Sequence, residues 1–206
     1  PNARRHKRDP LTSGEVRAVL ETCDGSDTGV RDRAILALMA YCGLRTVEVR
    51  RANLGHLGTR GDRLVLAVQG KGRREADEIV VIPHRAEPLL HAWVKVRSRL
   101  GACGEGAALF VSLSNRSRGR RLSSRAIRAM VKKRYREAGV VGPRKSTHSL
   151  RHSAVTAAIR GGATPMQVQA MARHASFDTT LGYFHEESRT ANPAEDLIDY
   201  REKETD

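Results

Sequence analysis

Apolar residues recur at helical spacing over most of the chain. Residues 30–42 form the most apolar of these segments, and Gly43 follows in the position where glycine commonly ends a helix. Near the start, Thr12 and Glu15 have the spacing of a capping box, which predicts a helix over residues 12–23. The same reasoning predicts further helices over residues 45–51, 85–99, 123–138, 148–160 and 165–173.

The period changes in the middle of the chain. Residues 64–68 alternate between two faces, and residues 78–82 form a second run rich in β-branched residues. Between them, Lys71 has a glycine on each side, and Pro83 ends the second run. This pattern predicts an antiparallel hairpin with a basic tip, followed much later by a short element at residues 180–185. The predicted fold class is mainly α with a small antiparallel β-hairpin, an α+β domain.

Charge divides the chain into two unequal parts. The 206 residues contain 37 Lys and Arg against 23 Asp and Glu, a formal net charge of +14. Eight acids and three bases follow residue 185, so the tail carries −5 and residues 1–185 carry +19. A body this basic predicts a polyanionic partner, with nucleic acid first and an anionic membrane surface second. Only three Phe, four Tyr and one Trp are present, which favours double-stranded DNA over a single strand bound by stacking rings.

Other classes of protein fit the sequence poorly. The longest apolar stretch, at residues 34–42, is far shorter than the roughly 20 residues of a membrane span. Residues 1–10 are basic with no apolar segment behind them, unlike a secretory signal. The three cysteines are far apart and in no Cys-x-x-Cys spacing, which predicts reduced thiols in a cytoplasmic protein.

Two candidate phosphate-binding groups lie in the first half of the chain. Arg45 comes two residues after Gly43, and Glu48 lies at a spacing that lets its carboxylate orient the guanidinium. Taken alone, such a pair is more typical of a surface ion pair. Lys71 stands between glycines that let the backbone approach a ligand closely, although a lysine at a hairpin tip is usually only solvated.

Two further candidates lie near the end of the chain. His148, Arg151 and His152 share one face in the first turn of a predicted helix, where free amide groups favour an anion. A metal site there fits less well, because no carboxylate or thiol completes it. His174 precedes Tyr183 by nine residues. A tyrosine, whose pKa is ordinarily about 10, acts as a nucleophile only beside cations or a base, and alone it is more typical of packing.

In their order along the chain, these groups resemble the tyrosine recombinase (phage integrase) family. The resemblance covers roughly residues 9–190 and implies the catalytic-domain fold of that family. Supporting segments are Asp9-Pro-Leu-Thr-Ser-Gly-Glu15 and Arg31-Asp-Arg-Ala-Ile-Leu36. The four motifs that carry it are Tyr41-Cys42-Gly43-Leu44-Arg45-Thr46-Val47-Glu48, Gly70-Lys71-Gly72, His148-Ser149-Leu150-Arg151-His152, and His174 with Tyr183.

The resemblance implies an enzyme that cleaves and rejoins DNA. Tyr183 would attack a scissile phosphate, giving a 3′-phosphotyrosyl link and a free 5′-hydroxyl, with no metal, ATP or other cofactor. The implied roles of the other groups are phosphate binding by Arg45, Arg151 and His174, proton transfer by His148 and Lys71, and orientation of these groups by Glu48 and His152.

Two positions depart from the family pattern. Arg173 stands before His174 where the family usually has glycine, and Gly182 precedes Tyr183 where a larger residue is usual. Either the turn at Arg173 is placed differently or Arg173 becomes a candidate phosphate contact, and Gly182 predicts an unusually flexible segment at Tyr183. Other candidate DNA contacts are basic residues of the hairpin tip and of the helix over residues 123–138, namely Arg73, Arg125, Arg128, Lys132 and Lys133.

The resemblance also predicts a domain organisation. Residues 1–8 correspond to a basic linker, residues 9–190 to the catalytic domain, and residues 191–206 to a C-terminal helix and acidic tail. A core-binding domain usually precedes the catalytic one, so we expect a catalytic domain separated from its clamp, or an unusually small member. The last helix would dock on a neighbouring protomer of a tetramer on DNA, unless it frays or folds back in cis.

Three functions fit the sequence. The first is a site-specific recombinase, an integrase of a mobile element. The second is a relaxing enzyme resembling type IB topoisomerases, which uses similar chemistry on one duplex as a monomer. The third is a DNA-binding regulator without chemistry. The target sequence does not follow from the chain, because a few groove contacts and DNA shape determine it.

Overall fold

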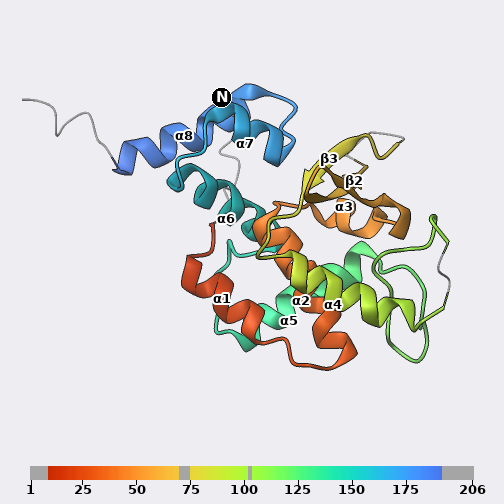
Figure 1. The fold of residues 1–206 in the computed structure, drawn as a ribbon. Helices are drawn as coiled ribbons and strands as arrows, with labels where there is room; N and C mark the ends of the chain where they lie inside the picture. Colours follow the sequence, from red (N-terminus) through yellow and green to blue (C-terminus); the bar gives the residue numbers. More distant parts are fainter. Residues whose placement is uncertain (1–8, 70–74, 102–103, 192–206) are drawn as a thin grey trace, which may run out of the picture.

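The computed structural model describes residues 9–69, 75–101 and 104–191, which form eight α-helices and a small sheet that lies at one edge of the fold (Figure 1). Among these residues no helix is long and apolar enough to cross a bilayer. The elements are α1 Ser13–Glu21, α2 Asp27–Tyr41, α3 Thr46–Arg51, a 3₁₀ turn at Leu54–His56, β1 Leu57–Arg60, β2 Arg63–Val68, β3 Glu78–Val81, α4 Glu87–Ser98, α5 Ser124–Glu137, α6 Thr147–Arg160, α7 Pro165–Ala172 and α8 Phe177–Ala191.

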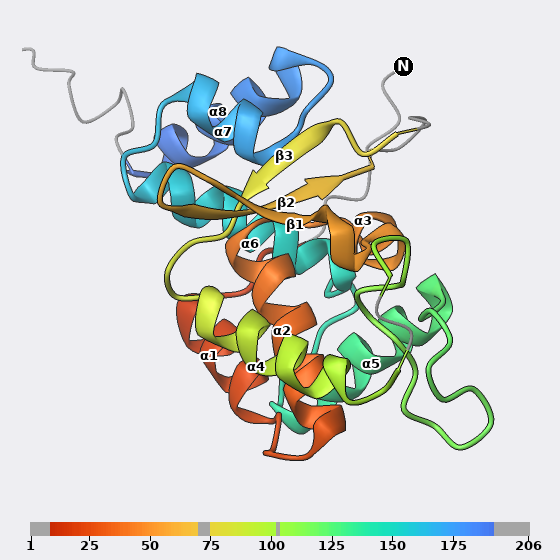
Figure 2. The same ribbon diagram turned by 45° about the vertical axis from the view of Figure 1, so that its right-hand side comes forward.

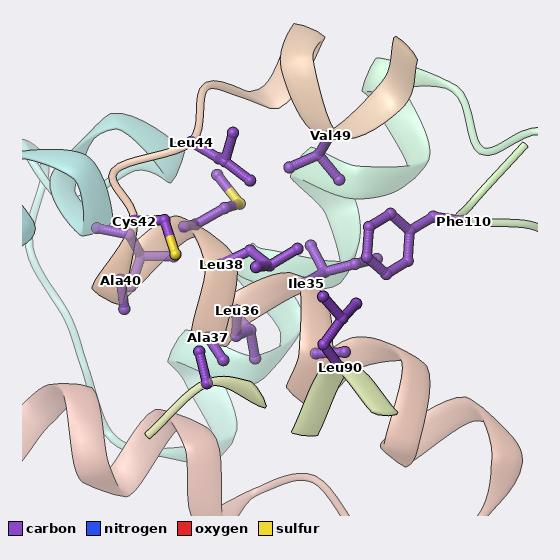
Figure 3. Packing of buried hydrophobic residues seen from close by; sticks show 14 of the residues in the cluster. Ile35, Leu36, Ala37, Leu38, Ala40, Cys42, Leu44, Val49, Leu90 and Phe110 are labelled. Carbon is purple, nitrogen blue, oxygen red and sulfur yellow. The ribbon is translucent and has the colours of Figure 1, made fainter. Parts of the chain in front are cut away.

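Helix α2 is the centre of the main core. It packs against α4 on one side and α6 on the other (Figure 2). Its residues 34–39 are at most 1% exposed, so this part of the helix is apolar on every side, as a segment enclosed by its neighbours must be. Figure 3 shows Ile35 and Leu38 among side chains from other segments, including Leu90 and Phe110.

The sheet has three antiparallel strands in the order β1, β2, β3. The predicted hairpin of β2 and β3 is confirmed, with Leu66 opposite Val80 and Val65 opposite Val81. Strand β1 was not predicted. Its first residue, Leu57, pairs with Leu66, but its other three residues are exposed, so it lacks the alternation that marks a half-buried strand.

The predicted helices agree with the structure apart from their ends and one length. The Thr12 capping box is present, and α2 begins three residues earlier than predicted because Ser26 caps it. The short element predicted at residues 180–185 is wrong in extent, because α8 runs from Phe177 to Ala191. The predicted linker at residues 1–8 and the helix expected after Asn192 lie outside the described residues.

A second, smaller apolar cluster packs α6, α7 and α8 together. Val155 of α6 and Val168 and Ala172 of α7 are fully buried, and Tyr183 and Phe184 of α8 pack against them. In Figure 2, α7 and α8 lie at the top of the molecule, and α6 lies below them next to α2. Because α6 also contacts α2, it joins the two clusters.

A buried ion network fastens the main body. Asp32 of α2 accepts hydrogen bonds from Arg31 at 2.6 Å and from Arg134 of α5 at 2.9 Å. Arg134 also donates to the Thr22 carbonyl, just after α1. These contacts hold α1, α2 and α5 together, on a part of the fold distinct from the small α6–α8 cluster.

Candidate active site

The turn after α2 places the first arginine of the site. Gly43 adopts a φ of +61°, which reverses the chain, and Arg45 two residues later is the N-cap of α3. The carbonyl of Gly43 points back into the site, where it accepts hydrogen bonds from Nη1 of Arg151 at 2.7 Å and Nη2 of Arg173 at 3.2 Å. The turn at Gly43 thus places Arg45 and binds the side chains of Arg151 and Arg173.

Glu48 is the anion of this cluster and is completely buried. Its Oε1 lies 2.6 Å from Nη1 of Arg45, and its Oε2 accepts the backbone amide of Arg45 at 2.7 Å. Burial alone would raise the pKa of the Glu48 carboxyl, but Arg173 and Arg45 hold that pKa below its usual value. Glu48 is therefore ionised at neutral pH and fixes the start of α3.

The C-terminal end of α7 orients the two predicted phosphate-binding arginines. The carbonyl of Ala172 accepts hydrogen bonds from Arg45 at 3.3 Å and from Nη2 of Arg151, and the carbonyl of Arg173 accepts one from Arg45 at 2.9 Å. These carbonyls have no partners within the helix, so they are natural acceptors for cations. Each guanidinium has five N–H donors, so both keep donors for a ligand.

Arg151 is the more deeply buried of the pair. Only 6% of the residue is exposed, one turn into α6, whereas the Arg45 side chain is 23% exposed. Burial, with the neighbouring charges of Arg45 and Arg173, lowers the pKa of Arg151 to about 9. A buried cation with cationic neighbours is stabilised by binding an anion. This arrangement is suited to a phosphate group.

His174 connects the arginine cluster to the tyrosine. Its Nδ1 lies 2.9 Å from Oγ1 of the fully buried Thr180, and its ring stacks on that of Tyr183 with centroids 5.8 Å apart. Burial lowers the pKa of His174 to about 4, with further contributions from Arg151, Arg45 and Arg173. At neutral pH His174 is therefore an uncharged hydrogen-bonding group.

Tyr183 lies on α8 with its hydroxyl against α6. The hydroxyl is 3.1 Å from Nδ1 of His152, and the two ring centroids are 5.2 Å apart. Burial raises the pKa of Tyr183, although Arg151 opposes this effect. The phenol is consequently protonated at neutral pH and has an imidazole beside it that can accept its proton.

This geometry joins an arginine pair, a neutral histidine and a tyrosine with a proton acceptor. The model of the phage integrase family matches residues 10–189 of the chain. The chain belongs to this family, the tyrosine recombinases.

Relatives of this tyrosine recombinase include XerC enzymes. The chain is 35% identical to tyrosine recombinase XerC of Corynebacterium glutamicum over 156 residues, and 34% identical to that of Corynebacterium efficiens over 184 residues. These alignments cover 76% and 87% of this chain but 47% and 56% of the relatives. The chain therefore spans about half the length of these curated relatives.

Solved recombinase structures share the fold. A post-cleavage complex of the XerH site-specific recombinase with its palindromic difH substrate superposes with a TM-score of 0.75 at 20% identity. The superposition covers 92% of this chain and 53% of that one. At this identity the similarity establishes the architecture, which confirms the predicted catalytic-domain fold of tyrosine recombinases.

The structure brings five of the predicted site residues together in one cluster, and others lie elsewhere or outside the described residues. Arg45, Glu48, Arg151, His174 and Tyr183 converge between α3, α6, α7 and α8. Lys71 and Arg73 lie outside the described residues. The candidate DNA contacts on α5 are exposed side chains, namely Arg125, Arg128, Lys132 and Lys133.

Three placements differ from the sequence expectation. The sequence assigned proton transfer to His148 and an orienting role to His152, but it is His152 whose ring touches the Tyr183 hydroxyl, while His148 is an exposed residue of the first turn of α6. The Arg173 side chain is 4% exposed and turned onto Glu48, so it does not have the placement of a phosphate contact. Thr180, the partner of His174, was missed because nothing in its sequence context distinguishes it.

The described residues contain no group of three His, Cys, Asp or Glu side chains arranged to hold a metal ion. Within that part of the chain, Cys23 and Cys42 are buried free thiols. Burial raises the pKa of the Cys42 thiol to about 12, although the neighbouring charge of Arg173 opposes this. Cys42 is therefore an apolar packing residue beneath the turn that carries Arg45.

Proposed function

We propose that this chain is the catalytic domain of a site-specific DNA recombinase that works through a covalent 3′-phosphotyrosyl intermediate. The observation that carries the proposal is the placement of Tyr183. Its hydroxyl contacts a possible proton acceptor, and its ring stacks on His174, which in turn lies in the field of Arg45 and Arg151. A scissile phosphate bound by the two guanidiniums would meet the tyrosine at this point.

In the proposed step, Oη of Tyr183 attacks the phosphorus, and the bond from phosphorus to the 5′-oxygen breaks. The phenolic proton passes to an imidazole, and the leaving 5′-oxygen takes a proton from Lys71. Arg45 and Arg151 stabilise the charge that accumulates on the non-bridging oxygens, each contributing roughly 10²–10³ in rate. The reverse reaction, with the 5′-hydroxyl of another strand as nucleophile, rejoins the DNA, so no other energy source is required.

The contact geometry supports His152 as the group that accepts the proton of Tyr183. An acceptor needs to lie within hydrogen-bonding reach of the proton it takes, which His152 does at 3.1 Å. We place His148 one helical turn away, at the N-terminal end of α6, on the phosphate side of the same step. Its exposed position beside the first amides of α6 suits a ligand that arrives with the DNA.

Double-stranded DNA is the proposed partner. Residues 1–185 carry a net charge of +19, and Arg125, Arg128 and Lys132 lie exposed along α5. The XerH structure with which the chain superposes is a complex with its difH substrate. Binding through phosphates predicts a steep loss of affinity with salt, with a slope that falls by about one for each phosphate contact removed. We further propose assembly as a tetramer on DNA, with residues 191–206 docking on a neighbouring protomer.

The proposal is tested by covalent capture. The protein is incubated with a pool of nicked duplexes of randomised sequence, and DNA that remains attached to protein on a denaturing gel is recovered and sequenced. We expect a Tyr183-dependent adduct on the 3′ side of the break and enrichment of one sequence. Absence of an adduct with the wild-type chain, or an adduct that persists in Tyr183→Phe, would show that the mechanism is wrong.

A further inference from the structure

Arg173 adopts a backbone conformation that is unfavourable for its residue type. Its φ and ψ are 52° and 50°, and it is the only non-glycine residue with positive φ in the described part of the chain. An L-residue with a long side chain is disfavoured there, whereas glycine is not. The side chain must therefore make interactions that offset this cost, at a position where the family pattern usually has glycine.

Those interactions are specific and buried. Nη2 of Arg173 lies 2.8 Å from Oε2 of Glu48, and Nε lies 3.3 Å from Oε1. The guanidinium therefore makes a bidentate contact with one carboxylate. The remaining bonds go to the carbonyls of Met171 at 2.6 Å and Gly43 at 3.2 Å. The side chain is 4% exposed and that of Glu48 is fully buried. A guanidinium enclosed in this way has a protein ligand on each of its nitrogen atoms.

The same two residues contact Arg45. Glu48, gripped by Arg173 from one side, binds Nη1 and the backbone amide of Arg45 from the other. The carbonyl of Arg173 accepts Nη2 of Arg45 at 2.9 Å. The guanidinium of Arg45 is therefore held between a carboxylate that Arg173 orients and a carbonyl that the left-handed turn at Arg173 directs toward it.

We propose that Arg173 is a positioning residue of this recombinase, which acts through Glu48 and its own left-handed carbonyl to hold Arg45 in the phosphate-binding orientation. The inference rests on the proposed function, because it concerns the phosphate site of that reaction. It assigns Arg173 to the protein side of the site, since its buried guanidinium faces Glu48 and not the solvent.

Charge balance supports the same role. Arg45 and Arg173 both bind the carboxylate of Glu48, and Arg151 lies within the same electrostatic cluster, so these four side chains carry a net charge of +2. Without Arg173, Glu48 would neutralise more of the charge of Arg45, and the cluster would attract a phosphate less strongly. Arg173 thus also prevents the orienting carboxylate from weakening the cation that it orients.

The experiment measures single-turnover cleavage of the captured duplex at saturating protein, together with the Kd for the same duplex. Arg173→Gly removes the guanidinium and relieves the backbone conformation. We expect its cleavage rate to fall by about 10- to 100-fold, the loss typical of a displaced reacting group, with Kd changed by less than about threefold. Arg173→Lys keeps the positive charge but loses the bidentate geometry of the guanidinium, so it should cleave faster than Arg173→Gly but more slowly than the wild type. Arg99→Ala, which removes an exposed ion pair with Asp27, is the control and should cleave normally.

A double-mutant cycle tests whether Arg173 acts through Glu48. In a Glu48→Gln background, adding Arg173→Gly should slow cleavage by less than about threefold, because the carboxylate it orients is already absent. A purely structural role predicts instead that the two effects multiply and follow the loss of melting temperature. The inference would be overturned if the rate losses of Arg173→Gly and Glu48→Gln multiplied in the double variant, or if Arg173→Gly alone cleaved at the wild-type rate. Either result would leave the proposed function intact.

A second measurement requires no activity. In the wild-type protein the carboxyl carbon of Glu48, observed by NMR, should titrate below the usual range of a glutamate, because Arg173 and Arg45 together outweigh the effect of its burial. In Arg173→Gly the pKa of Glu48 should rise. An unchanged pKa would show that the ion pair is absent in solution and would refute the inference, whatever the outcome of covalent capture.

Discussion

The hydroxyl of Tyr183 and Nδ1 of His152 lie 3.1 Å apart, although the two residues belong to different helices, α8 and α6. The contact exists because the small cluster around Val168 and Ala172 packs α8 against α6 and α7. Tyr183 is thus held by an apolar cluster separate from the main core. The position of Tyr183 relative to Arg151 depends on α6, which contributes to both apolar clusters.

The contact predicts different effects for the two histidines of α6. His152→Phe removes the acceptor while retaining a ring that packs near Tyr183, and single-turnover cleavage should fall by about 10²–10⁴-fold, the usual contribution of a general base. The readout is formation of the covalent adduct under saturating protein, with binding measured separately.

His148→Asn is the matched variant for that measurement. It should reduce the rate less than His152→Phe does and weaken binding of the scissile phosphate. If His148→Asn abolished adduct formation while His152→Phe left the rate near that of the wild type, the proton would belong to His148, as the sequence alone suggested.

How far the sequence predicts this site depends on the kind of feature. Arg45, Arg151, His174 and Tyr183 follow from motif order, because each motif is marked by its own turn or helix start. Which of these residues contact one another within the site does not follow from motif order. Both histidines of α6 lie on one face four residues apart, about 6 Å along the axis, and only the packing of α8 decides which one meets the tyrosine.

The same distinction applies to the fold. The apolar segment of α2 and the alternation in β2 are local patterns, and both predicted their elements correctly. The length of α8 was underestimated because its polar residues and Gly182 conceal the helical period. Contacts between Tyr183 and Phe184 and the α6–α7 cluster, and an ion pair from Glu187 to Arg160, support this helix. These are tertiary interactions that a local pattern does not contain.

Gly43 should tolerate a side chain sterically but not conformationally. A Cβ at this position would lie 3.7 Å from that of Ala154 and 3.8 Å from Cγ of Arg151, which are ordinary contacts. Its φ of +61°, however, costs an L-residue roughly 1–2 kcal/mol. Gly43→Ala should therefore lower the free energy of unfolding in urea by about that amount. Gly25→Ala is the control, because a Cβ there meets nothing within 4 Å and its φ is not positive.

Asp32 should be among the most sensitive polar positions of the main body. Asp32→Asn removes the charge that Arg31 and Arg134 share and leaves two nearly buried guanidiniums without it. Breaking a buried pair in this way costs about 3–5 kcal/mol of unfolding free energy. Asp27→Asn, which breaks an exposed pair with Arg99, should cost less than about 1 kcal/mol. Equal losses in the two variants, measured by urea denaturation, would show that the network contributes nothing beyond a surface pair.

The lowered pKa of His174 predicts a pH dependence of stability. Burial, with Arg151, Arg45 and Arg173 nearby, lowers the pKa of His174 to about 4 in the folded protein. In the unfolded chain a histidine has a pKa of about 6.5. Between these values the unfolded chain binds a proton that the native protein does not. Stability contributed by neutral His174 is therefore complete above about pH 6.5 and declines as the pH falls toward 4.

The free energy of unfolding, measured in urea at intervals from pH 7 to 4.5, should fall with decreasing pH in the wild type and less steeply in His174→Gln. This window lies above the range in which Glu48 takes up a proton, because the pKa of that carboxyl is lowered. His56, whose pKa is also lowered by burial and by Arg121, provides the matched control. His56→Gln should retain the steep dependence that His174 causes. Identical slopes in the wild type and His174→Gln would mean that His174 is not held neutral by the arginine cluster.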